Sequence, residues 1–282
     1  MWLKLTLFLA AGLAAMVAAA LALGTARWRG ASEELHAGLV AAPLPTGPAT
    51  YQASELDALP APVRRYFRAV LSEGQPMVSA VQLEQTGSFN MSESGEQWKP
   101  FTATQHVTTR PPGFVWNARI ALLPGLPVRV HDAYVGGEGL LHASLFGLIT
   151  VAEMRATPAM NAGELMRFLA EAAWYPTALL PSQGVQWEAV DETSARATLA
   201  DGDTRVGLLF RFNGEGLIES VRAEARGRSV AGEVIPTPWE GRWRDYALRG
   251  GMRIPLEGEV AWLLPEGRKP YWRGRIGQIR FE

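Results

Sequence analysis

The sequence predicts a mainly β (α+β) fold: a large curved antiparallel sheet or half-open barrel with one or two covering helices, preceded by an N-terminal transmembrane helix. Three observations indicate this fold. Many short segments with an alternating apolar pattern follow one another from Val78 onward. One amphipathic helical pattern interrupts them near 158–175. An uncharged apolar run from Leu5 to Leu23 stands at the start of the chain.

The N-terminal run is long enough to cross a bilayer. A spanning helix needs about 20 apolar residues, whereas the core of a signal peptide has about 7–15. The run from Leu5 to Leu23 therefore favours a retained single-pass anchor within 1–29, although 20–22 (ALA) resembles a cleavage site and leaves a cleaved secretory signal as the alternative. A short N-terminus before such a run is typical of a translocated domain, so we expect the body to be extracytoplasmic, in the periplasm.

Two further regions follow the anchor. Residues 30–53 are predicted to be a linker, because 41–50 (AAPLPTGPAT) is rich in proline. Residues 54–282 are predicted to form a single β-rich domain. Ten to twelve strands are expected, mostly joined by tight turns such as Gly136-Gly137 and Asp201-Gly202, and short turns imply antiparallel neighbours.

Two helices are expected on the sheet, near 54–71 and 158–175. In the second, Leu165, Phe168 and Leu169 share one apolar face, and Glu164, Arg167 and Glu171 lie on the other, where they can form ion pairs. Asn161 is a candidate N-cap, and Thr157-Pro158 offers an alternative start.

Composition excludes several kinds of chemistry. The chain of 282 residues has a net charge of −1, is 20% charged and contains no cysteine. Nucleic acid is therefore not an expected partner, and disulfides, thiolate metal sites and thiol nucleophiles are excluded. No phosphate loop, nucleophile elbow or zinc-protease motif is found, so no catalytic residue, metal or cofactor is assigned and the balance is against an enzyme.

The best polar group is a pair of histidines. If Gly136 and Gly137 form the hairpin turn, His131 faces His142 on the same side of the sheet, whereas Asp132 points to the other side. A third metal ligand is missing, so a hydrogen-bonded histidine pair is the default interpretation.

Tryptophan is the other unusual feature, with ten in the chain. Strand tryptophans on the concave side of a curved sheet would line an apolar cavity, although an ordinary aromatic core is the simpler interpretation. The residues predicted to contact a ligand are Trp116, His131, Tyr134, His142, Trp174 and Tyr175.

Several stretches resemble an uncharacterised bacterial family of membrane-anchored proteins, a domain of unknown function. They are 59–67 (LPAPVRRYF), 114–116 (FVW), 132–139 (DAYVGGEG), 174–181 (WYPTALLP) and 249–255 (RGGMRIP). More weakly, the hairpin from Tyr246 to Pro255 is similar to hairpins of periplasmic lipoprotein-carrier proteins. That resemblance implies a half-open barrel whose helices cover a hydrophobic cavity.

Three functions remain open. The first is a membrane-tethered, extracytoplasmic domain that binds an apolar or amphiphilic ligand, lipid or lipoprotein-like. The second is a non-catalytic envelope assembly module, with the surface of the central helix binding an unknown protein partner. The third is a histidine-dependent hydrolase that uses His131, His142 and Asp132.

Overall fold

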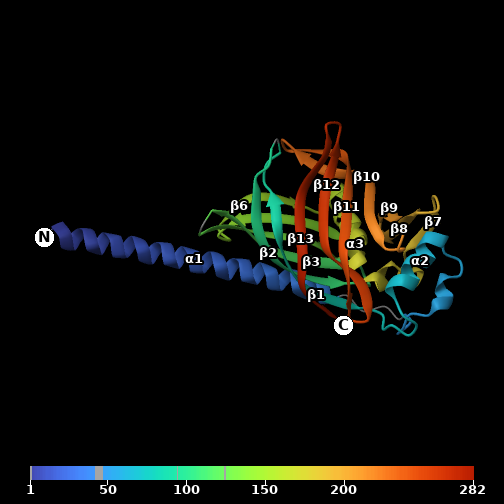
Figure 1. Cartoon of the computed structure of the whole chain (residues 1–282). Coiled ribbons are helices and arrows are strands. Elements are labelled where there is room, and N and C mark those ends of the chain that lie inside the picture. Colours follow the sequence, from blue (N-terminus) through green and yellow to red (C-terminus); the bar gives the residue numbers. More distant parts are fainter. Residues whose placement is uncertain (1, 42–46, 94, 124) are drawn as a thin grey trace.

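A computed structural model describes residues 2–41, 47–93, 95–123 and 125–282. It confirms the predicted fold class: one open antiparallel sheet with helices on it and a long apolar helix before it (Figure 1). The sheet contains thirteen strands among these residues, against the ten to twelve expected.

The sheet consists of two meanders. The first contains β1 (Ala80–Asn90), β2 (Trp98–Thr108), β3 (Gly113–Leu123), β4 (Leu126–Val135), β5 (Glu138–Leu145) and β6 (Ile149–Arg155). The second contains β7 (Gln186–Ala189), β8 (Ser194–Asp201), β9 (Thr204–Phe212), β10 (Ile218–Val230), β11 (Glu233–Arg249), β12 (Met252–Leu264) and β13 (Gly267–Phe281). Pairing of β1 with β13 joins the two, so β6 and β7 are the edges of the sheet.

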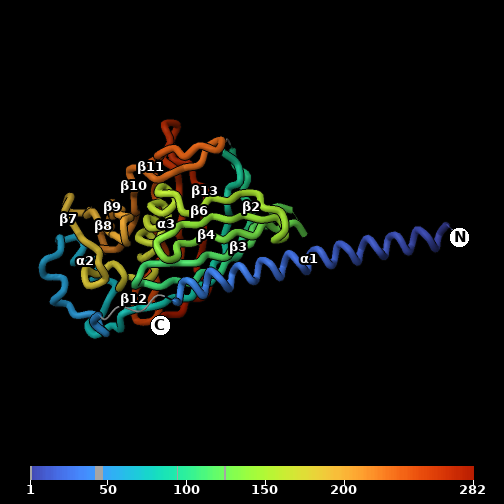
Figure 2. The backbone as a smooth tube through the Cα atoms, turned by 180° about the vertical axis from the view of Figure 1, so that it is seen from behind, coloured from blue at the N-terminus to red at the C-terminus, as the bar shows by residue number. Residues whose placement is uncertain are grey.

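The segment between the meanders must travel from one edge to the other. It does so through α3 (Pro158–Glu171) and three short 3-10 helices at Ala172–Trp174, Pro176–Leu179 and Pro181–Gln183. Figures 1 and 2 show α3 lying within the curve of the sheet. Its apolar residues join the main core with α2 (Ala61–Val70), whose Val63, Tyr66 and Phe67 are fully buried. The segment thus fills part of the concavity that an open sheet would otherwise expose.

The start and the polar face of α3 differ from the first expectation. Thr157 is the N-cap, accepting a hydrogen bond from the Met160 amide, and Pro158 begins the helix. The Asn161 side chain instead accepts a bond from the amide of Gly139. Glu164 and Glu171 are buried, at 4% and 8% exposure, so the face expected in solvent lies inside the protein.

Three glycines in register allow the sheet to curve around its aromatic core. Gly87, Gly274 and Gly258 are lateral neighbours on β1, β13 and β12. A Cβ atom on Gly274 would lie 2.3 Å from the Trp272 ring, and one on Gly258 would lie 2.6 Å from the Trp243 ring. Missing side chains therefore leave room for indole rings to lie close to the backbone of the inner face.

The N-terminal helix α1 (Trp2–Val40) is one unbroken helix that continues past residue 29, where the linker was expected to begin. Its first part is exposed and apolar, long enough to cross a membrane. Its last part packs on the outer face of the sheet, where Trp28 and Leu39 are each only 5% exposed. The helix is therefore held to the sheet by side-chain contacts as well as by its covalent connection to the rest of the chain.

Candidate functional site

An apolar cavity of about 690 Å³ lies between the inner face of the sheet and the first turns of α3. One wall comes from β3 to β6, through Ile120, Val130, Leu141 and Met154. The opposite wall comes from β10 to β13, including Trp262 and Tyr271. The cavity remains open because α3, which crosses the sheet from one edge to the other, covers the concave face only in part.

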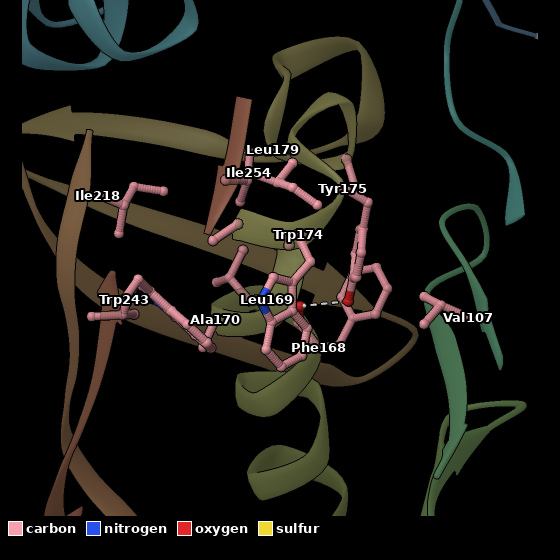
Figure 3. Close-up of a cluster of buried hydrophobic side chains, with 14 of the residues drawn as sticks. Val107, Phe168, Leu169, Ala170, Trp174, Tyr175, Leu179, Ile218, Trp243 and Ile254 are labelled. Carbon is pink, nitrogen blue, oxygen red and sulfur yellow. Dashed lines mark hydrogen bonds between the residues drawn. The ribbon is translucent and has the colours of Figure 1, made fainter. Parts of the chain in front are cut away.

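A second, much smaller cavity of about 70 Å³ lies deeper, beside the end of α3. Aromatic rings surround it, among them Trp174 and Trp243, whose ring centroids are 5.0 Å apart and whose planes are nearly perpendicular (Figure 3). Trp116, Asp132 and Arg226 line both cavities, so the two spaces adjoin at these residues.

A network of buried charges separates the cavities. Arg167 donates to Asp132 at 2.6 Å and to Glu171 at 2.8 Å, and Arg226 donates to Glu164 at 3.2 Å. The guanidinium of Arg167 also lies 5.2 Å from the Trp116 ring. Buried charges of this kind persist only when they are paired. The network therefore holds Asp132, Glu164 and Arg226 at the floor of the large cavity.

The charges balance when one acid is protonated. Burial, and then the nearby carboxylate of Asp132, hold the pKa of Glu164 well above its usual range. With Glu164 neutral, Asp132 and Glu171 offset the two arginines. Among the described residues, Asp132 Oδ1 and Glu164 Oε2 are buried without a hydrogen-bond partner, which marks the floor as polar but incompletely satisfied.

The six residues predicted to contact a ligand do not form one site. Trp116 lines both cavities and Trp174 lines the small one. Tyr134 and Tyr175 are fully buried on the same side of the sheet, but neither belongs to the lining of these two cavities. Their hydroxyls donate to Asp201 and to the Phe168 carbonyl. His131 and His142 lie on the opposite, outer face of the sheet.

The predicted register of the histidine pair is confirmed, since His131 faces His142 across β4 and β5. The surroundings of His131 were not foreseen. Its ring stacks on Trp28 of α1 at 3.8 Å, and its Nε2 lies 2.8 Å from Ser32 Oγ. Burial, and then His142, lower the pKa of His131 to about 4. His131 is thus a neutral residue of the contact between α1 and the sheet.

The network of buried charges escaped the sequence analysis. Glu164, Arg167 and Glu171 have the spacing of a solvent face, and nothing local shows that the sheet curls around them. Arg226 lies on β10 where the pairing with β11 is irregular, between Ala223 and Arg226. Such an irregularity redirects side chains relative to simple alternation.

Residues 57–281 match a family of unknown function, DUF6920. The chain belongs to that family, which confirms its resemblance to an uncharacterised family. The search of curated proteins finds no match.

Two solved structures resemble the fold. One is a LolA superfamily protein, NE2245, from Nitrosomonas europaea, at 10% identity and a TM-score of 0.33, with 72% of this chain and 86% of that chain covered. The other is a beta-barrel-like protein of domain of unknown function DUF1849 from Brucella abortus, at 10% identity and a TM-score of 0.21, with 73% and 99% covered.

Proposed function

We propose that the protein is a membrane-tethered, extracytoplasmic domain that binds an apolar or amphiphilic ligand of the lipid kind in the concavity of its sheet. The observation that carries this proposal is the cavity of about 690 Å³ under α3. Pockets that bind small molecules commonly measure about 300–1,000 Å³ and are mostly apolar, with a few polar groups that orient the ligand.

The lining fits an acyl chain better than a polar metabolite. Aliphatic side chains of β3 to β6 form one wall, and the ring of Trp262 belongs to the other. Each methylene that leaves water for such a lining contributes about 0.8 kcal/mol. An acyl chain therefore gains affinity in proportion to its buried length without needing a hydrogen bond from the protein.

The charged floor of the cavity can recognise the polar end of the ligand. Arg226 and Asp132 line the large cavity next to its apolar wall, and the side chain of Arg226 is already held by Glu164. A head group with both acceptors and donors can bond to the spare N–H groups of the guanidinium and to the carboxylates. This combination of an apolar wall and a fixed charged floor favours an amphiphile over a pure hydrocarbon.

The N-terminal helix supports a retained anchor. It has no break at 20–22, where a signal peptidase would cut, and it continues into the part that packs on the sheet. Exposed side chains such as Leu7 and Phe8 earlier in the helix are suited to lipid.

The two other candidate functions lose the features that suggested them. The surface of the central helix was the candidate for binding a partner, and the charged side of this helix, α3, is buried against the sheet. The histidines and Asp132 lie on opposite faces of β4, and His131 is covered by α1. We therefore retain the ligand-binding function as the proposal.

The test is photo-crosslinking of the full-length protein in phospholipid vesicles that contain a lipid with a diazirine on its acyl chain. Mass mapping should find adducts on cavity residues such as Leu141 and Met154. Ala143→Phe places a ring in the cavity and should remove these adducts, whereas Ala121→Phe, at an exposed position on β3, should not. Adducts confined to the membrane part of α1 would contradict the proposal.

A further inference from the structure

We infer that the turns β3–β4 and β5–β6 lie in the bilayer interface as a loading rim, so that the ligand enters the cavity directly from the membrane. We define the loading rim as Leu122, Leu123 and 145–151. The inference rests on the proposed function for the identity of the cargo and for the membrane span of α1. The position of the rim is argued from the way α1 is attached to the sheet.

The height of the body above the membrane is fixed by a contact between backbones. A Cβ atom on Gly24 of α1 would lie 2.4 Å from the Phe146 carbonyl oxygen and 2.7 Å from the Leu148 side chain. In return, a Cβ atom on Gly147 would meet the Gly24 carbonyl. The β5–β6 turn therefore sits directly on the helix, and Arg129 of β4 adds a 3.1 Å hydrogen bond to Thr25.

That contact lies where the apolar stretch of α1 ends. Gly24 immediately follows the uncharged run from Leu5 to Leu23. At 1.5 Å per residue the run is about 28 Å long, close to the thickness of the hydrocarbon core. Because α1 is unbroken, a helix that spans the bilayer with this run places Gly24, and the turn packed on it, at the membrane surface.

The rim has the side chains that an interface favours. Leu123, Ile149 and Val151 are exposed at 60%, 61% and 50%. The sequence contains no charged residue in 120–128 or 143–152, and Arg119 and Arg129 flank the first of these stretches. Apolar tips with basic neighbours are typical of surfaces that insert among lipid head groups. Both views of the backbone show this end of the body nearest the free end of α1 (Figures 1 and 2).

The rim is continuous with the cavity. Leu122, Leu145 and Val151 line the large cavity, while Leu123 and Ile149 beside them point to the outside. A lipid that leaves the bilayer at the rim would thus pass from the membrane to the cavity wall over apolar side chains. The acyl chain would then not pass through water, where its exposure is strongly unfavourable.

The test uses single-cysteine variants of the full chain, which has no cysteine of its own. A fluorophore is attached at Leu123→Cys, Ile149→Cys or, as the control, Leu248→Cys, which is 69% exposed at the β11–β12 end of the sheet. The protein is reconstituted in phosphatidylcholine vesicles with a small fraction of lipid that carries a nitroxide at the head group. We expect several-fold stronger quenching at the two rim positions than at Leu248, and the reverse order with iodide in the aqueous phase.

Two results would overturn the inference. Rim probes that iodide quenches as strongly as the control would show that the turns lie in water. Rim probes shielded from both quenchers, together with crosslinking of two chains through Ile149→Cys, would show that another copy covers the rim. Failure of the proposed function is distinguishable, because it would leave the quenching pattern intact while no acyl-chain adduct forms in the cavity.

The functional consequence is tested with Leu123→Asp combined with Ile149→Asp. Both positions are exposed, so the charges should leave the melting temperature unchanged. The rate of adduct formation in the cavity should fall several-fold with lipid supplied in vesicles, and should recover with a short-chain diazirine lipid that is soluble as a monomer. Equal rates for the variant and the wild type with vesicle lipid would contradict entry at the rim.

Discussion

Replacement of Trp28 by alanine should release the last part of α1 from the sheet. The indole of Trp28 is 5% exposed, stacks on His131 at 3.8 Å and donates a 3.2 Å hydrogen bond from Nε1 to Asn117. In the described part of α1, Trp28 is the one aromatic side chain that is buried in this contact. His36 packs against His106 but is exposed. We therefore expect Trp28 to dominate the docking free energy of the described part of the helix.

The magnitude follows from the buried area and the lost contacts. A buried tryptophan removes about 150–250 Å² from water, and truncation of a large buried aromatic residue costs about 3–5 kcal/mol. Opening of the docked helix away from the sheet should therefore become about 10² to 5 × 10³ times more frequent. Trp28→Phe keeps a ring on His131 but loses the bond to Asn117, so it should cost only about 1 kcal/mol beyond the smaller ring area.

Hydrogen exchange measured by mass spectrometry on the full-length protein in nanodiscs is the assay. Amides of 33–40 should exchange faster in Trp28→Ala by the factor given above, because exchange reports the population of the open state. The control is Arg29→Ala, at an exposed position on the same turn. Equal protection of 33–40 in Trp28→Ala and in the wild type would refute the assignment of Trp28 as the main docking residue.

Three further outcomes are expected. Because the pKa of His131 is lowered to about 4, docking of α1 on the sheet should be strongest above a pH of about 6.5 and should weaken as the pH falls toward 4. The loss of docking free energy should be at most about 3 kcal/mol. Unchanged hydrogen exchange of 33–40 over this pH range would contradict the expectation. Because the pKa of Glu164 is raised, the wild type should lose stability as the pH rises above the ordinary glutamate range, and Glu164→Gln should remove that slope in a thermal melt. Gly258→Ala places a Cβ atom 2.6 Å from Trp243 and should destabilise the protein by about 1–3 kcal/mol. The control is Gly277→Ala, whose Cβ atom has its nearest neighbour at 3.8 Å and should be near neutral. Equal melting temperatures of the two variants would contradict the glycine argument.

The fold was predictable where local patterns and topology agree. Alternation and turn residues located the strands, and the turn Gly136-Gly137 alone was enough to predict that His131 faces His142. The same local rules failed for α3. The spacing of Glu164 and Arg167 predicts a solvent face, but the sheet curls around the helix, so tertiary packing overrides the helical pattern.

The candidate site was predictable only in part for the same reason. Trp116 and Trp174 line cavities as proposed from their aromatic character, but Arg226 reaches the site through an irregular strand pairing that no periodic pattern shows. The contact between α1 and the sheet was missed because an apolar run followed by a proline-rich stretch predicts an anchor and a linker. Nothing in that pattern indicates that Trp28 contacts His131, because the two residues lie far apart in the sequence.

The most direct test of the central claim is native mass spectrometry of the full-length protein released in the spectrometer from nanodiscs made with its host membrane lipids. Ligand binding in the cavity predicts one tightly held adduct of lipid mass, retained after the loosely bound lipids of the anchor are stripped. Ala143→Phe should lose that adduct and Ala121→Phe should keep it. A protein that always appears without an adduct, or whose adduct survives equally in both variants, would contradict the claim that the cavity binds a lipid.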